Sequence, residues 1–157
     1  MSLIILGVSG CGKTAVGLEL SIALKLPFYD ADDFHSKENK EKMSHGVPLT
    51  DADRLPWLNT LATLLKEKGP LILGCSALKE SYRKILKVSP DVQFIYLKGS
   101  YELIYNRLKK RHGHFFDPHL LKSQFADLEE PKDAIVIDTA PPVPQIVMTI
   151  LQALGGE

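Results

Sequence analysis

The chain has 157 residues, of which 45% are hydrophobic and 24% are charged, and its formal net charge is zero. These values predict one globular domain over residues 1–157, with no overall attraction to nucleic acid or to a membrane surface. The short N-terminal apolar run leads into glycines, and no run approaches the roughly 20 residues of a membrane span, so we expect a cytoplasmic protein.

Short apolar runs alternate along the chain with longer segments that have helical spacing. The runs predict five strands, at residues 3–6, 27–32, 70–76, 92–97 and 134–138. The longer segments predict helices, with Pro56 in a first helical turn, near residues 13–25, 57–68, 79–88, 100–111, 119–129 and 142–154. This alternation is typical of an α/β fold with about five parallel strands flanked by helices.

The stretch "GVSGCGKT", residues 7–14, fits the pattern G-x-x-x-x-G-K-[ST] between a predicted strand and a predicted helix. Backbone N–H groups of such a loop point at phosphate oxygens, and the helix N-terminus adds its positive dipole. Lys13 is expected to reach the terminal phosphates, and Thr14 to place its hydroxyl on Mg²⁺. The sequence therefore predicts a site for a nucleoside triphosphate, whose other contacts are Gly7, Val8, Ser9, Gly10, Cys11 and Gly12.

The two cysteines, Cys11 and Cys75, lie inside motif-like stretches and do not form a spaced framework. This favours reduced thiols over a disulfide. The thiol of Cys11 is expected to be incidental, because it occupies a variable position of the loop pattern.

The stretch "FYDADDFH" carries acidic residues where a short strand is expected to end. Asp30 and Asp32 are two residues apart, so the period of a strand places them on one side and Asp33 on the other. Such a pair beside a phosphate loop suits Mg²⁺ positioning and acceptance of a proton from an attacking hydroxyl. The alternative is an acidic turn without a function.

Two charged segments, residues 33–55 and 107–125, lack a strand pattern and are expected to carry substrate contacts as a small insertion and a mobile lid. Arg107 and Arg111 share a helix face, so one can stack on a base while the other reaches phosphates. Gly113, followed by the aromatic pair 115–116, favours a lid that excludes water.

The chain lacks the sequence motifs that are typical of other classes of nucleotide-binding protein. The stretch "NKEK" at 39–42 lacks the aspartate of the guanine motif N-K-x-D, and it is interpreted as a solvated helix face. Asp138 ends the last predicted strand, too far along the chain for a motor ATPase acid, and is expected to cap the following turn or to shape the nucleotide-base site.

The chain resembles the small gluconokinases, which are P-loop kinases with a nucleoside-monophosphate-kinase-like fold. The resemblance runs from Ile4 to about Asp138, and it is carried by "GVSGCGKT", "FYDADDFH", "ENKEKMSHGVPLTDADRLPWL", "CSALKESYRKIL", "FIYLKG", "RLKKRHGHFF" and "LLKSQFADLEEP". It implies transfer of the γ-phosphoryl group of ATP, with Mg²⁺, to the 6-hydroxyl of D-gluconate. It also implies a possible homodimer.

The resemblance also implies roles for single residues. Asp30 would assist the metal and Asp32 would act as base, although which of Asp32 and Asp33 faces the acceptor hydroxyl stays open. Arg107 would stack on adenine, and Arg111 would stabilise the transferred charge. Substrate contacts would come from the cations Arg54, Lys79 and Arg83 and from His35, Trp57 and Gln124.

Two alternatives are considered. A shikimate-kinase-like enzyme shares the fold and the acid pair but typically carries a glycine triplet where this chain has "GCSALK". A nucleotide-binding module without catalysis would have no need for the lysine, the acid pair and the two arginines together.

Overall fold

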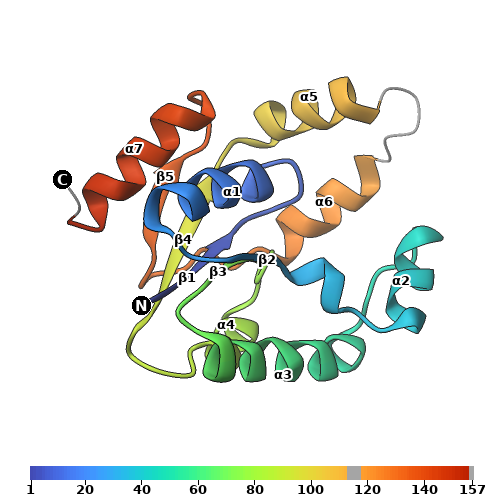
Figure 1. The fold of residues 1–157 in the computed structure, drawn as a ribbon. Helices are drawn as coiled ribbons and strands as arrows, with labels where there is room; N and C mark the ends of the chain where they lie inside the picture. Colours follow the sequence, from blue (N-terminus) through green and yellow to red (C-terminus); the bar gives the residue numbers. More distant parts are fainter. Residues whose placement is uncertain (113–117, 156–157) are drawn as a thin grey trace.

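The structure is a computed structural model that describes residues 1–112 and 118–155 (Figure 1). Its centre is a five-stranded parallel sheet in the order β2-β3-β1-β4-β5. The strands are β1 (Ser2–Leu6), β2 (Phe28–Asp30), β3 (Ile72–Gly74), β4 (Val92–Lys98) and β5 (Ile135–Asp138). The predicted α/β fold with five parallel strands is confirmed.

Helices cover both faces of the sheet, so β1 is buried on both of its sides. Leu3 and Ile5 belong to a core shared with α1 and α7, whereas Ile4 and Leu6 belong to a core shared with α3 and α4. The helices are α1 (Lys13–Leu24), α2 (Lys37–Ser44), α3 (Asp51–Lys68), α4 (Glu80–Leu86), α5 (Tyr101–His112), α6 (Pro118–Asp127) and α7 (Val143–Ala153), with a 3-10 helix, η1 (Ala31–Phe34).

The third helix starts earlier than its sequence pattern predicts. Thr50 and Asp53 form a capping box, in which each side chain accepts a hydrogen bond from the backbone N–H of the other, at 3.0 and 2.9 Å. Helix α3 therefore begins at Asp51, and Pro56 lies inside it, so the placement of Pro56 in a first turn was wrong.

The interpretation of residues 39–42 as a solvated helix face was also wrong in one respect. These residues do lie on α2, but Asn39 is buried because its side chain packs between His35 and the start of α3. Helix α2 and the first turn of α3 occupy most of the predicted insertion.

Three further expectations concern single features of the fold. Cys11 and Cys75 are both free and buried, in agreement with the prediction of reduced thiols. Asp138 accepts a hydrogen bond from the Ala140 N–H at 2.9 Å, so it caps the turn after β5. Within residues 1–112 and 118–155, no helix combines the length and the apolarity that crossing a membrane requires.

Candidate active site

The glycine loop joins the end of β1 to the start of α1. Gly10 and Gly12 have φ angles of +84° and +101°, in the left-handed region that disfavours residues with a side chain. A Cβ atom on Gly10 would also lie 2.8 Å from Cγ of Leu108, a residue of α5. Glycine at these positions lets the backbone curl tightly at the N-terminus of α1, as phosphate binding requires.

Lys13 is folded back onto the loop. Its ammonium group donates hydrogen bonds to the carbonyl oxygens of Gly7 and Val8, at 2.8 and 3.0 Å. Thr14 follows on the first turn of α1 and is exposed. The loop therefore holds a cation in its concavity, beside an accessible hydroxyl group.

A pocket of about 250 Å³ opens beside the loop, at the carboxyl edge of β2 and β3. The parallel register aligns Asp30 of β2 with Gly74 of β3, and Gly74 with Ile5 of β1, just before the loop. The predicted residues that line this pocket are Ser9, Lys13, Asp30, Asp32, His35, Arg54, Trp57 and Gln124.

The structure brings the acid pair together by a different geometry from the predicted one. Asp30 ends β2, but Asp32 lies in η1, where its backbone N–H donates to the Asp30 carboxylate at 3.0 Å. Both carboxylates line the pocket, so the alternation of a strand is not the reason that they share a side. Partial desolvation raises the pKa of Asp32, the Asp30 carboxylate raises it further, and Lys13 opposes both effects.

His35 and Trp57 form one wall of the pocket. Their rings stack with centroids 4.1 Å apart and planes 15° apart, and the indole N–H donates to the Ala31 carbonyl at 2.7 Å. Burial lowers the pKa of His35 to about 4, and the positive charges of Arg54 and Lys40 contribute to this shift. His35 is therefore uncharged at neutral pH.

The cations predicted on the substrate side separate into different environments. Arg54 lines the pocket and donates to the Tyr82 hydroxyl at 2.8 Å, and that hydroxyl donates to Asp51 at 2.5 Å. Lys79 is the N-cap residue of α4 and pairs with Asp51 at 3.2 Å, outside the lining of the pocket. Only Arg54 of the three predicted cations faces the acid pair's pocket.

A second pocket, of about 330 Å³, lies on the other side of the glycine loop. Arg107 and Arg111 of α5 line it together with the segment after β5. Arg107 donates to the carbonyl of Thr139, and the Thr139 hydroxyl donates to the carbonyl of Cys11. This chain of contacts joins α5, the end of β5 and the glycine loop. Both arginines line this second pocket, and neither lines the pocket with Asp32.

Gln124 of α6 is bound to the loop itself. Its side-chain carbonyl accepts from the Ser9 backbone N–H at 2.7 Å, and its amide donates to the Ser9 hydroxyl at 2.9 Å. The Ser9 backbone N–H, a donor of the glycine loop, is therefore already hydrogen-bonded to Gln124.

The chain is similar over most of its length to several proteins that are described as gluconokinases. A gluconokinase of Escherichia coli described as thermosensitive is 48% identical over 136 residues, covering 83% of this chain and 73% of that one. A probable gluconokinase of Mus musculus is 41% identical, covering 97% and 96%. The crystal structure of a gluconokinase from Sinorhizobium meliloti 1021 has a TM-score of 0.92 at 40% identity, covering 98% and 91%. The sequence pattern of the family described as "Shikimate kinase" matches residues 9–154.

The chain belongs to the gluconokinase family, within the broader shikimate kinase family. The prediction of a kinase with a P-loop fold is thereby confirmed. The roles of single residues are not tested by these likenesses and stay predictions.

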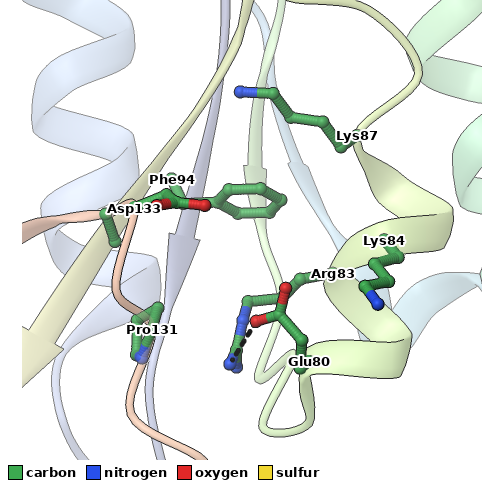
Figure 2. Close-up of a pocket in the computed structure, with 8 residues that line it drawn as sticks. Glu80, Arg83, Lys84, Lys87, Phe94, Pro131 and Asp133 are labelled. Atoms are coloured by element: carbon green, nitrogen blue, oxygen red, sulfur yellow. Dashed lines mark hydrogen bonds and ion pairs between the residues drawn. The ribbon is translucent and has the colours of Figure 1, made fainter.

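One residue that resemblance to the gluconokinase family assigned to substrate lies elsewhere. Arg83 is buried. Its guanidinium donates hydrogen bonds to the carbonyls of Ala77 and Glu129, at 2.8 and 2.7 Å, and to the Glu80 carboxylate at 3.2 Å. It lines a separate pocket with Lys84, Lys87 and Phe94 (Figure 2), and no residue of the glycine loop is in the lining of that pocket. Arg83 lies within α4, whereas Lys79 is the N-cap residue that precedes its first turn.

Sequence reasoning missed three residues that shape the site: Asn39, Tyr82 and Thr139. Asn39 carried a signal, since it follows His35 by only four residues. Tyr82 and Thr139 carried none, because their partners are distant in sequence. The predicted lid residues Gly113, Phe115 and Phe116 lie outside the described residues.

Proposed function

We propose that this protein transfers the γ-phosphoryl group of ATP to the 6-hydroxyl of D-gluconate. One observation carries the proposal: in a chain of the gluconokinase family, a pocket lined by Asp30, Asp32 and Arg54 opens directly beside the phosphate loop lysine. A donor phosphate on the loop and an acceptor in this pocket would lie next to each other, which phosphoryl transfer requires.

On the donor side, the glycine loop and the α1 N-terminus supply backbone N–H groups for the phosphates of ATP. Lys13 would leave the Gly7 and Val8 carbonyls for the terminal phosphates. The second pocket, with Arg107 and Arg111, would take the base and the adjacent charge.

The oxygen donors present fit Mg²⁺, which in kinase sites is held by one or two carboxylates together with substrate phosphates. Asp30, which lines the pocket, and the exposed hydroxyl of Thr14 would hold it. Residues 1–112 and 118–155 contain no group of three or more acidic, histidine or cysteine ligands, so the phosphates would complete the coordination. When bound, the ion would neutralise phosphate charge during transfer.

On the acceptor side, Asp32 would accept the proton of the 6-hydroxyl as its oxygen bonds to the γ-phosphorus and the bond to ADP breaks. Its raised pKa makes this carboxylate a stronger base than an ordinary aspartate. Arg54 would pair with the carboxylate of gluconate, since the Tyr82 hydroxyl holds its guanidinium at the pocket. Free cysteines suit the reducing cytoplasm that we expect for this reaction.

The test is ADP release by purified protein with Mg²⁺ and ATP, comparing D-gluconate with shikimate, glucose and no acceptor. We expect rapid release with gluconate alone. A rate that rises with shikimate instead would support the shikimate-kinase-like alternative, and ATP binding without any acceptor-dependent rate would support the binding module.

Asp32→Asn tests the proposed base, and Asp33→Asn is its matched control because Asp33 is a neighbouring exposed carboxylate outside the pocket lining. We expect Asp32→Asn to lower kcat about 100-fold or more, the usual effect of losing a general base. Asp33→Asn should stay close to the parent protein. The reverse pattern would move the base to Asp33.

A further inference from the structure

Asn39 lies in the first turn of α2, four residues after His35 in the chain, and its side chain is outside the pocket lining. It is 5% exposed, and its amide nitrogen lies 2.8 Å from the Asp53 carbonyl oxygen and 3.3 Å from Nδ1 of His35. Asn39 therefore connects η1, α2 and α3 at the back of the pocket wall.

These two contacts determine where the proton of His35 resides. A carbonyl oxygen can only accept a hydrogen bond, so the Asn39 atom that faces Asp53 must be the NH₂ nitrogen. The same group faces Nδ1 of His35 with its other proton. Nδ1 must then be the acceptor, which leaves the proton of the neutral ring on Nε2.

Nε2 faces the reacting side of the pocket. It lies 4.0 Å from Oδ1 of Asp32, whose side chain is 77% exposed, whereas the side chain of His35 is only 3% exposed. A donor and an acceptor at this separation suit one hydroxyl group, which can accept from the imidazole and donate to the carboxylate.

We propose that Asn39 is a positioning residue that holds His35 as the Nε2–H tautomer, so that His35 donates to a substrate hydroxyl oxygen while Asp32 accepts from a hydroxyl. The assignment rests on the proposed function for the identity of the substrate, a polyol, but the tautomer itself does not. It gives the two side chains different tasks: His35 orients the acceptor and takes no proton, and Asp32 is the base.

The surroundings keep His35 neutral as well as oriented. Trp57 of α3 covers one ring face, and Arg54 of α3 and Lys40 of α2 are the cations that oppose protonation. Asp32 of η1 is an acidic group that faces the ring, at 4.0 Å from Nε2. Burial and these cations lower the pKa of His35 to about 4, so the donor role holds throughout the neutral range.

The tautomer is tested first, by the side-chain ¹⁵N chemical shifts of His35 in the full-length protein without substrate. We expect a protonated Nε2 and an unprotonated Nδ1. In Asn39→Asp the new carboxylate would accept from Nδ1, so the pattern should reverse or become doubly protonated. A protonated Nδ1 in the parent protein overturns the proposal, whether or not gluconate is the substrate.

Kinetics then test the donor role. His35→Gln can keep an N–H near the position of Nε2, whereas His35→Asn cannot reach it, so the KM for gluconate should rise about tenfold more in His35→Asn, the usual effect of one lost hydrogen bond. Asn39→Asp should raise this KM with little change in the Kd of ATP. Equal effects of the two His35 variants, or unchanged shifts and KM in a folded Asn39→Asp, would overturn the proposal. Absent turnover of gluconate by the parent protein would refute the proposed function alone.

Discussion

At the scale of the residue, a charged side chain binds a ligand or supports the fold according to what its donors already contact. Arg83 is 3% exposed, and its guanidinium donates to two backbone carbonyls and one carboxylate. Arg54 donates to one hydroxyl and faces the pocket. The two arginines have the same chemistry, yet only Arg54 is available to an anionic substrate.

This difference predicts opposite effects of the same substitution. Arg83→Met should lower the free energy of unfolding by about 2–4 kcal/mol, because it leaves the buried Ala77 carbonyl and the partly buried Glu129 carbonyl without this donor, and should leave the KM for gluconate unchanged. Arg54→Met should raise that KM with a smaller loss of stability. Denaturant unfolding and steady-state kinetics measure both quantities, and a raised KM in folded Arg83→Met would restore its substrate role.

At the scale of the element, the start of α3 holds the substrate-side segment in place. Asp53 accepts from the Thr50 N–H and pairs with Lys42 of α2 at 2.9 Å, while its carbonyl accepts from Asn39. Hydrogen bonds from Lys42 and Thr50 lower the pKa of Asp53 from 3.8 to about 2. The junction of α2 and α3 therefore prefers the ionised carboxylate.

A depressed folded-state pKa gives stability that is present above the unfolded value of 3.8 and is lost as pH falls through about 2. We therefore expect Asp53→Asn to lower the Tm most above pH 4, and the difference from the parent protein to shrink toward pH 2. Lys42→Met is the matched control, and the double variant should lose less than the sum of the two single losses. A difference in Tm that does not change with pH would refute this explanation.

A second contact between elements joins α6 to the glycine loop. Gln124 occupies the Ser9 N–H, a donor in the loop whose amides the phosphates of ATP need. Gln124→Ala should thus bind ATP about 2- to 10-fold more tightly, since the nucleotide no longer displaces a hydrogen bond. Calorimetric titration measures the change. Ser123→Ala, a neighbour in α6 that lines the same pocket, should bind as the parent does, and weaker binding by Gln124→Ala would contradict the idea.

At the scale of the whole molecule, the glycine loop separates two pockets that different helices complete. The pocket with Asp32 is closed by residues of α3 and α6, and the pocket with Arg107 by α5 and the segment before α7. The two ligands of the proposed reaction would therefore meet at the loop from opposite sides. The homodimer implied by the family resemblance stays a prediction.

This division predicts that the two ligands stabilise the protein independently. Because a ligand that binds only the folded state raises the Tm, ADP and gluconate should each raise it in the parent protein. Arg107→Ala should lose most of the shift caused by ADP and keep the shift caused by gluconate, each measured against the Tm of the variant itself. Loss of both shifts would show that the pockets are coupled.

The sequence alone determined the features that depend on local patterns. Short apolar runs gave the five strands, and helical spacing gave every α-helix of the described residues except α2, which is too polar to show that spacing. The loop from Gly7 to Thr14 was readable because its glycines and lysine lie within eight residues. The capping box was missed because it lies one turn before the apolar pattern begins.

Only the tertiary structure decided which side chains meet across long separations in the chain. Gln124 reaches Ser9 over 115 residues, and Arg83 turns from the expected substrate side to the Glu129 carbonyl, 46 residues away. No period or motif encodes such pairs, because each depends on where parallel strands and their crossover helices place two distant segments. The proposed tautomer of His35 also depends on tertiary structure, since it follows from the contacts of the Asn39 amide with His35 and with the Asp53 carbonyl of α3.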